Sequence, residues 1–513
     1  MAHLLSRPQH TAQRFNVNSF NPSTPQAKLR NICLRVFCDS EKLAVLLDDG
    51  QQSDIALQAC GSPIIKLLLH LSNAIKNREG NFDLVVQRLD DLINLAAEKF
   101  YAFPFKDVPA CWRDLFRQAS FLKVSALAVK QTWMQEGGNS SLNLNSKDQP
   151  LSWQQMDEMV MTIDMALIMA GPPPSSESQE QIKSVLDLLQ EIDMEDIHDS
   201  EETPPKKRRK IDDAALWQDR FPISKTFEPP VSNPIPKLNE PSFEEFERYM
   251  LRPKNDDLGP EPTIITGALK YWPARNDRPW KSPSYLLSKT IGGRRLVPIE
   301  LGRSYVDEGW GQKIITFKEF MDHYILHPNS LALATGYLAQ HDLFAQIPPL
   351  RDDITIPDYC YTSPPPPHYS SPLAEKHSKL PQLDEPLLNA WFGPVGTISP
   401  LHTDPYHNIL SQVVGRKYIR IYAPKESEKL YARGVEDGGV DMGNTSSLDI
   451  GVLVGWEGSD DERTGAREKF PLFQEAEFVD CILEEGECLY IPVGWWHYVR
   501  SLSVSFSVSF WFN

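Results

Sequence analysis

The chain has 513 residues, 41% hydrophobic and 24% charged, which is the composition of a globular protein long enough for several domains. Its formal net charge of −17 excludes a general nucleic-acid binder, because binding to phosphate backbones needs a basic surface. The seven cysteines are dispersed without a Cys-x-x-Cys pair, and the apolar stretches are short, so we expect a soluble intracellular protein without a membrane segment.

The first part of the chain has the pattern of a helical domain. Apolar residues recur at helical spacing over residues 27–170, and the alternation typical of strands is scarce. Pro172 to Pro174 end this pattern, and Ser178 with Gln181 then forms a capping box ahead of one more amphipathic helix. We predict an all-α domain over residues 1–195.

A strongly charged segment follows, and we predict that residues 196–230 are a linker. Ten acidic residues and one lysine occur between Pro172 and Thr203, and five consecutive cations follow at Lys206 to Lys210. The basic run resembles a nuclear localisation signal, and its alternative interpretation is a solvated part of the linker. We expect the protein in the nucleus, with a further cytoplasmic pool as the alternative.

From Pro236 onward, short strand-like blocks rich in aromatic residues alternate with Pro, Gly, Asn and Asp turns. This texture predicts a second, β-rich domain over residues 231–513. Two segments, 361–386 and 436–469, have the composition of long loops. The fold class is therefore α+β multidomain, with an all-α N-terminal domain followed by a β domain.

His402 and Asp404 are two residues apart, so on a strand their side chains share one face. His497 follows a second predicted strand and completes a set of two histidines and one carboxylate. Such a facial triad leaves open metal positions and is typical of non-haem Fe(II) oxygenases. A closed zinc site would need a fourth ligand. His407 is the nearest spare candidate, but its parity on a continuous strand is opposite to that of Asp404.

The last strand has a small polar face and a bulky apolar face. The polar face comprises Ser503, Ser505, Ser507, Ser509 and Trp511. We expect this face to line the cavity of a barrel, and the alternative is an edge strand with solvated serines.

Lys417 lies in an otherwise buried-looking strand, 413–422, and a buried lysine needs an anion. The distal carboxylate of 2-oxoglutarate suits it, whereas the alternative is a protein carboxylate at the barrel rim. Arg416, one residue earlier, should face the other way.

These segments resemble the JmjC-domain 2-oxoglutarate oxygenases. The resemblance covers most of residues 236–513 and runs through 297–302, 336–344, 356–360, 389–404, 415–422 and 497–511. It implies a double-stranded β-helix of the jelly-roll or cupin-like type, in which His402, Asp404 and His497 hold Fe(II). The helical N-terminal part matches only in general character, so its role stays open.

The resemblance also implies where the cosubstrates bind. Tyr337 and Lys417, helped by Ser399, would bind the distal carboxylate of 2-oxoglutarate. Asn408 and Trp511 would lie along the same pocket. Dioxygen (O2) would take the open metal position.

The substrate implied by the resemblance is a side chain of a protein or peptide, associated with chromatin or ribosomes. Hydroxylation of arginine is the preferred activity, and histone methyl-lysine demethylation is the alternative. Glu300 and Trp391 match substrate positions, where a carboxylate and a flat ring suit a guanidinium. The alternative is that Glu300 forms an ion pair at the barrel rim and that Trp391 is an ordinary core tryptophan. A non-catalytic JmjC scaffold or a zinc cupin are the alternatives outside this chemistry.

Overall fold

The computed structural model describes residues 24–45, 56–103, 107–136, 151–201, 220–223, 227–302, 309–327, 335–436, 439 and 441–513. They divide into two compact units, residues 1–159 with 175–198 and residues 160–174 with 199–513. The predicted domain limits at 195 and 230 stay predictions, and the basic run Lys206 to Lys210 lies outside the described residues.

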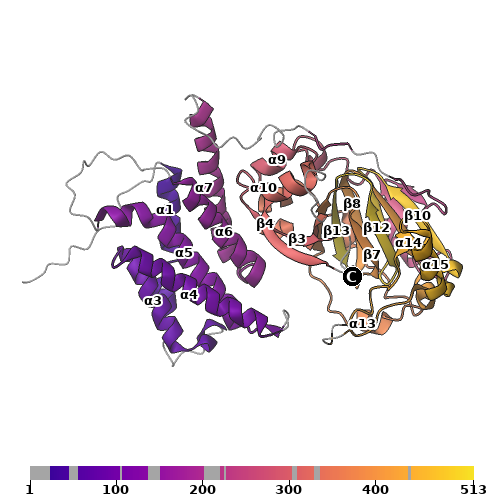
Figure 1. The fold of residues 1–513 in the computed structure, drawn as a ribbon, viewed down its shortest axis with the longest axis horizontal. Coiled ribbons are helices and arrows are strands. Elements are labelled where there is room, and N and C mark those ends of the chain that lie inside the picture. The colour runs from indigo at the N-terminus through magenta and orange to yellow at the C-terminus, as the bar shows by residue number, and fades with distance from the viewer. Residues whose placement is uncertain are drawn as a thin grey trace, which may run out of the picture. The chain divides into compact units, whose positions relative to one another are not determined.

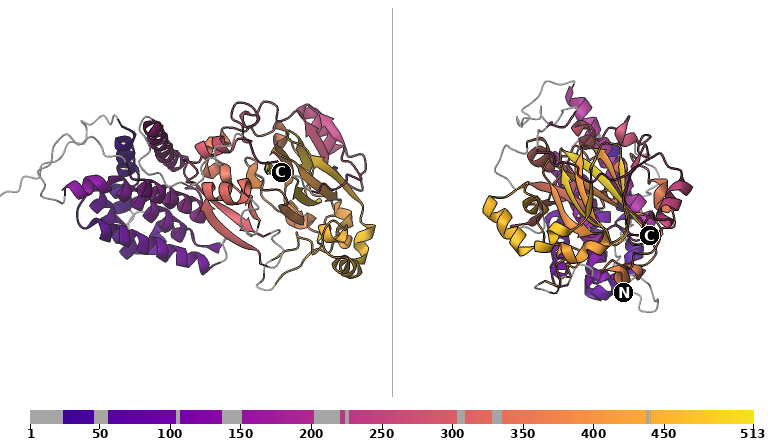
Figure 2. Two further views of the ribbon diagram at one scale, coloured as in Figure 1. Left: turned by 45° about the horizontal axis from the view of Figure 1, so that its top comes forward. Right: turned by 90° about the vertical axis from the view of Figure 1, so that its right-hand side faces the viewer.

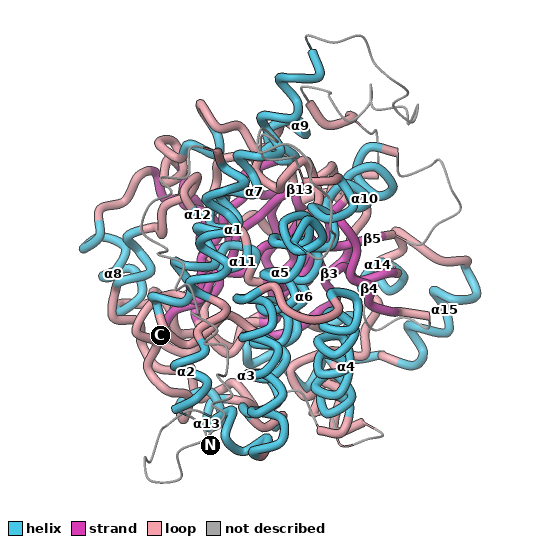
Figure 3. The backbone as a smooth tube through the Cα atoms, turned by 90° about the vertical axis from the view of Figure 1, so that its left-hand side faces the viewer, coloured by secondary structure: helices cyan, strands magenta, loops and turns pink. Residues whose placement is uncertain are grey.

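In the described part of the first unit all regular structure is helical, as Figure 3 shows, and the predicted all-α domain is confirmed. Its α-helices are α1 (Pro25–Val36), α2 (Ser40–Val45), α3 (Ser62–Asn77), α4 (Phe82–Tyr101) and α5 (Ala110–Glu136), with α6 (Trp153–Ala170) and α7 (Ser176–Glu201) divided between the units. A short 3-10 helix, Ala56–Cys60, precedes α3. Helix α3 buries one apolar stripe, in which Ile65, Leu68 and Leu71 follow at three-residue spacing.

Helix α7 begins earlier than the sequence pattern predicted. The hydroxyl of Ser175, not that of Ser178, accepts a hydrogen bond from the Ser178 backbone N–H at 3.2 Å, and the helix starts at Ser176. Ser175 is the first residue after the three prolines that has a capping hydroxyl, so the helix starts as soon as the prolines allow. The predicted capping box of Ser178 and Gln181 is therefore wrong, and α7 continues into the range predicted as linker.

The second unit is built on two β-sheets (Figure 1, Figure 2). Among the described residues the larger sheet has the order β1-β2-β11-β8-β13-β6-β5-β3-β4, and the smaller sheet has the order β10-β9-β12-β7. The larger sheet comprises β1 (Lys237–Asn239), β2 (Thr263–Thr266), β3 (Leu296–Leu301), β4 (Gly311–Thr316), β5 (Gly336–His341), β6 (Leu387–Gly393), β8 (His407–Val414), β11 (Cys488–Ile491) and β13 (Ser505–Phe512). The smaller sheet comprises β7 (Ile398–Thr403), β9 (Lys417–Tyr422), β10 (Phe478–Leu483) and β12 (Trp496–Ser501). The predicted jelly-roll is confirmed.

Short helices cover the outer face of the larger sheet. They include α8 (Phe243–Leu251), α9 (Pro283–Ser288), α10 (Phe317–Phe320), α11 (Leu343–Gln346), α12 (Pro348–Arg351) and the π-helical turn Met321–Leu326, with 3-10 turns at Pro273–Arg275 and Asp358–Tyr361. The apolar face of β13 packs against this layer, and on that face Phe506 stacks on Phe392 of the neighbouring strand β6 with ring centroids 4.6 Å apart. Ser505, Ser507 and Ser509 of the same strand are fully buried on the opposite face.

A separate apolar cluster fills part of the space between the two sheets. It contains Leu410 of β8 and Leu489 of β11 from the larger sheet, and Ile419 and Ile421 of β9 and Val499 of β12 from the smaller one. Because directly paired residues share a face, the residues opposite these positions also point between the sheets. The site residues described below belong to this inner face.

Both segments predicted as long loops contain helices. Residues 361–386 include α13 (Ala374–Ser378), and residues 436–469 include α14 (Ile450–Leu453) and α15 (Asp460–Lys469), followed by 3-10 turn Pro471–Glu475. The prediction of a long loop at 436–469 is wrong over α14 and α15, and a reciprocal capping box of Ser459 and Glu462 starts α15. Helix α14 packs on the outer face of the smaller sheet, against Tyr418 and Tyr498, and the 3-10 turn Pro424–Leu430 follows β9.

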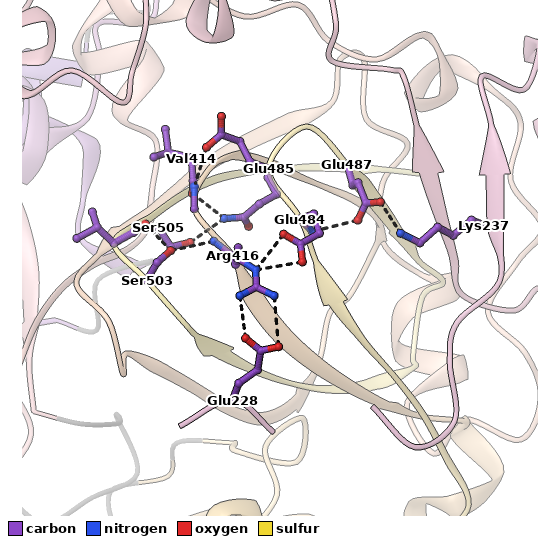
Figure 4. A network of polar contacts seen from close by, with 12 residues as sticks. Glu228, Lys237, Val414, Arg416, Glu484, Glu485, Glu487, Ser503 and Ser505 are labelled. Atoms are coloured by element: carbon purple, nitrogen blue, oxygen red, sulfur yellow. Dashed lines mark hydrogen bonds and ion pairs between the residues drawn. The ribbon is translucent and has the colours of Figure 1, made fainter. Parts of the chain in front are cut away.

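The turn between β8 and β9 is fixed by polar contacts (Figure 4). Arg416 contacts Glu484 with Nε at 2.9 Å and Glu228 with Nη1 at 2.8 Å, and its backbone N–H donates to the Ser503 hydroxyl. Arg416 therefore faces away from the inner face, as predicted, whereas Lys417 begins β9 with 1% of its surface exposed. Ser503 lies before β13 rather than in the predicted serine face of that strand.

Within the described ranges, no helix combines the length and the apolar character that a membrane crossing requires.

Candidate metal centre and adjoining pocket

The structure brings His402, Asp404 and His497 together between the sheets. His402 on β7 pairs directly with His497 on β12, and Asp404 follows the end of β7. One ligand atom from each residue lies within 4.8 Å of the other two. The carboxylate oxygens of Asp404 are 3.7 Å from Nε2 of His402 and 3.5 Å from Nε2 of His497.

Backbone carbonyls orient both imidazole rings. Nδ1 of His402 is 2.7 Å from the Pro400 carbonyl oxygen, and Nδ1 of His497 is 3.1 Å from that of Trp495. With a carbonyl acceptor at each Nδ1, a proton on that nitrogen can donate, and Nε2 of each ring faces Asp404. Burial lowers the pKa of His497 to about 4, with the charge of His402 adding to the effect, so this ring is neutral at pH 7, as a metal ligand must be.

The donor set therefore fits a divalent transition metal that keeps open coordination positions. Two imidazoles and one carboxylate suit iron, and a closed four-ligand zinc site would need one more donor. His407 does not provide it, because its Nδ1 lies 2.8 Å from the Tyr490 hydroxyl and its Nε2 3.0 Å from the Pro365 carbonyl. Among the described residues, the metal-ligating group consists of His402, Asp404 and His497 alone.

Lys417 is a buried cation without a carboxylate partner among the described residues. Its Nζ lies 3.2 Å from the hydroxyl of Tyr337 on β5, and that is the single hydrogen bond it makes there. Burial lowers the pKa of Lys417 to about 7. Burial also raises the pKa of Tyr337 well above its usual range, an effect partly offset by a hydrogen bond with Ser399. These three groups can hold an anion, and no described carboxylate pairs with Lys417 as the rim alternative would require.

Asn408 and Trp511 face each other across β8 and β13 and leave two buried polar atoms unsatisfied. The side-chain N–H of Asn408 donates to Oδ2 of Asp404 at 3.0 Å, so Asn408 also orients a metal ligand. Its Oδ1 and the indole Nε1 of Trp511 have no partner within the described chain. A polar molecule bound between the sheets would give both atoms a hydrogen-bond partner. This agrees with the prediction that Asn408 and Trp511 lie along a cosubstrate pocket.

The two predicted substrate residues adjoin Tyr337. Glu300 on β3 pairs directly with Tyr337, and the ring of Trp391 on β6 lies 6.2 Å from the ring of Tyr337. Trp391 donates from Nε1 to the Ser509 hydroxyl at 3.0 Å. Burial raises the pKa of Glu300, although a hydrogen bond with Trp310 opposes the shift. A carboxylate and an aromatic ring thus border the same part of the inner face.

His377 on α13 is a residue that the sequence did not single out. It is buried, its Nδ1 has no partner among the described residues, and the charge of Asp404 acts on its pKa, which burial lowers. Segments 361–386 and 436–469 also meet, where Lys376 pairs with Asp441 at 2.8 Å. The Thr403 N–H donates to the Asn444 carbonyl at 2.9 Å. Described parts of both segments therefore border the metal centre.

Comparison with known proteins identifies the same region. Residues 258–513 match the family model described as a cupin-like domain. The chain is 34% identical to "Lysine-specific demethylase 8" of Danio rerio over 91% of this chain and 95% of that protein. It is 44% identical to "Lysine-specific demethylase JMJ30" of Arabidopsis thaliana over 49% of this chain and 50% of that protein. It is 38% identical to "Jumonji C domain-containing protein 5" of Drosophila melanogaster over 54% of this chain and 60% of that protein.

Proposed function

The chain belongs to the JmjC family of 2-oxoglutarate-dependent dioxygenases, and from this premise we propose that it hydroxylates an arginine side chain of a protein. Iron(II) bound with 2-oxoglutarate and O2 supplies the power to oxidise a C–H bond, with release of succinate and carbon dioxide. His402, Asp404 and His497 are the residues that would hold the iron, because they offer the facial donor set with open positions.

The residues of the inner face have distinct proposed roles. Protonated Lys417 and the Tyr337 hydroxyl bind the distal carboxylate of 2-oxoglutarate, and Ser399 orients Tyr337. The indole N–H of Trp511 donates to the cosubstrate from the opposite wall. Asn408 holds Asp404 in position through its N–H donor. The apolar cluster between the sheets excludes water from the reaction.

The observation that carries the arginine assignment is Glu300, a partly buried carboxylate beside Tyr337 and near Trp391. A guanidinium can pair with a carboxylate through two N–H donors and stack on an indole. A trimethylammonium has no N–H donor and is bound by aromatic cages. Demethylation of methyl-lysine is the second candidate, favoured by the names of the relatives in Danio rerio and Arabidopsis thaliana.

Glu300→Gln tests this assignment. We expect kcat/KM for an arginine-containing peptide to fall at least about tenfold, because the guanidinium loses a charge-assisted pair. The affinity for 2-oxoglutarate should change little, since the groups proposed to bind it remain. Steady-state kinetics with succinate detection measures both. A matched control is Glu468→Lys, an exposed change on α15. Equal activity of the Glu300→Gln variant and the wild type on arginine peptides would contradict the assignment.

We propose a nuclear location, supported by the five cations at Lys206 to Lys210. Replacing all five by Ser should move a fluorescent fusion of the full chain from the nucleus to the cytoplasm, because the import signal loses its charge. Fluorescence microscopy measures the nuclear fraction. Replacing Asp199, Glu201 and Glu202 by Ser tests in parallel whether the preceding acidic residues mask the run. Unchanged nuclear enrichment of the five-residue variant would reject this location signal.

A further inference from the structure

A cleft of about 650 Å³ opens at the end of β9 and along β10. Its walls are largely apolar and come from five separate parts of the second unit. The apolar lining residues include Leu258, Pro262, Ile421, Val479 and Trp495. Neither the metal ligands nor the residues proposed to bind 2-oxoglutarate belong to its lining.

The cleft adjoins one metal ligand through the strand pairing of the smaller sheet. His497 pairs directly with Ile421, and Ile421 pairs directly with Val479. Since neighbouring strands lie about 4.8 Å apart, these two cleft residues are about one and two strand spacings from His497. Trp495, whose carbonyl orients the His497 ring, lines the cleft as well. An extended polypeptide advances about 3.3 Å per residue, so about three residues span from the metal to the cleft.

The rim of the cleft is acidic. Glu261, Glu475 and Glu477 lie along it against the single cation Lys425. Lys425 pairs with Glu477 at 3.2 Å. The carboxylates of Glu261 and Glu475 make no ion pair with a described residue, and the hydrogen bonds recorded for these two residues involve their backbone carbonyls. The acidic rim therefore favours a ligand with positive charge, and the apolar walls favour a neighbouring apolar side chain.

We propose that the cleft docks the substrate polypeptide beside its target residue, binding an apolar side chain flanked by Lys or Arg about three positions away. This inference rests on the proposed function, because it defines the substrate surface of the same site. The floor of Ile421, Val479 and Trp495 takes the apolar side chain, and Glu261 and Glu475 pair with its basic neighbours. Substrate choice then depends on the sequence around the modified residue as well as on that residue.

Peptide binding to the full chain, followed by fluorescence anisotropy, tests the proposal without turnover. The probes are two labelled peptides with a central arginine and Lys-Leu-Lys placed either before or after it, and matched peptides with Glu-Ser-Glu instead. One variant combines Glu261→Lys with Glu475→Lys, and a second, Val479→Trp, fills the cleft. Glu468→Lys, on the exposed face of α15, is the charge control. Circular dichroism establishes that each variant is folded.

We expect one Lys-Leu-Lys peptide to bind, and its affinity to fall about tenfold in each cleft variant but not in Glu468→Lys. Equal binding of the Lys-Leu-Lys and Glu-Ser-Glu peptides, or wild-type affinity in both cleft variants, would overturn the proposal. A dimer that the cleft variants abolish, without peptide binding, would assign the cleft to a second copy and also overturn it. Peptide docking by a chain that modifies methyl-lysine would instead contradict the proposed function and leave the docking surface standing.

Discussion

Replacing any one of His402, Asp404 or His497 by Ala is expected to lower 2-oxoglutarate turnover by about a thousandfold or more. Three ligands on one face are the minimum that leaves room for a chelating cosubstrate and O2, so a two-ligand site loses the metal or its geometry. Changes at outer-shell partners of metal ligands already cost about ten- to hundredfold, and loss of a ligand costs more. Succinate formation and bound iron are the two quantities to measure.

The fold should survive these substitutions, because most of the apolar clusters around the sheets are untouched. His323→Ala is the matched control, since His323 is an exposed histidine of the same unit and lies outside the metal-ligating group. It should keep wild-type turnover and iron content. Turnover above background in a double variant lacking both His402 and Asp404 would show that the reaction takes place elsewhere.

Lys417→Met is expected to raise the KM for 2-oxoglutarate about a hundredfold or more. The variant loses the buried cation, and leaving one charge of a buried pair unmatched costs about 3–5 kcal/mol. The variant should stay folded, because methionine fills a similar volume. No described carboxylate pairs with Lys417, so the substitution leaves no protein carboxylate without its partner. Steady-state kinetics and thermal unfolding measure the two effects. An unchanged KM would mean that the cosubstrate binds without Lys417.

The same lysine gives the wild type a pH dependence that the variant lacks. Burial lowers the pKa of Lys417 to about 7, so the free enzyme loses this proton as the pH rises through 7. Binding of a carboxylate requires the protonated form, and the apparent Kd for 2-oxoglutarate should therefore rise about tenfold per pH unit above 7. Calorimetric titration of wild type and Lys417→Met between pH 6.5 and 8.5 tests this; parallel curves would contradict it.

Local patterns were sufficient to predict much of this architecture. Helical periodicity indicated the first unit, and the strand blocks with the family resemblance indicated the jelly-roll. The two-residue spacing of His402 and Asp404 predicted a shared face, and the structure brings both residues next to His497. Lys417 was recognisable because a lysine in a buried-looking strand needs an anionic partner.

Other features depended on competition between local signals. Ser178 had a glutamine at the capping-box position, but Ser175 comes first after the prolines and caps α7. The capping box of Ser459 and Glu462 was present in the sequence, although the surrounding Gly, Asp and Ser residues suggested a loop. In both cases the helix starts at the serine whose hydroxyl accepts a hydrogen bond from a backbone N–H of the first turn. The average composition of the surrounding segment does not decide where the helix starts.

Features made by distant segments had no local signal. His377 comes near Asp404 because α13 folds over the rim, and nothing in its own sequence indicates this. The acidic cleft combines residues near 233, 260, 423, 476 and 495, which only the pairing of β9 with β10 and β12 brings together. Such sites require the three-dimensional structure, because their chemistry belongs to no single motif.

The most direct test of the proposed activity is the mass of the product. The full chain, supplied with iron(II), ascorbate and 2-oxoglutarate, is incubated with a library of arginine and methyl-lysine peptides and analysed by tandem mass spectrometry. We expect the mass of one oxygen atom to be added to an arginine, with succinate formed and no formaldehyde released from methyl-lysine peptides. Loss of methyl groups from lysine with release of formaldehyde, while arginine peptides stay unmodified, would contradict arginine hydroxylation.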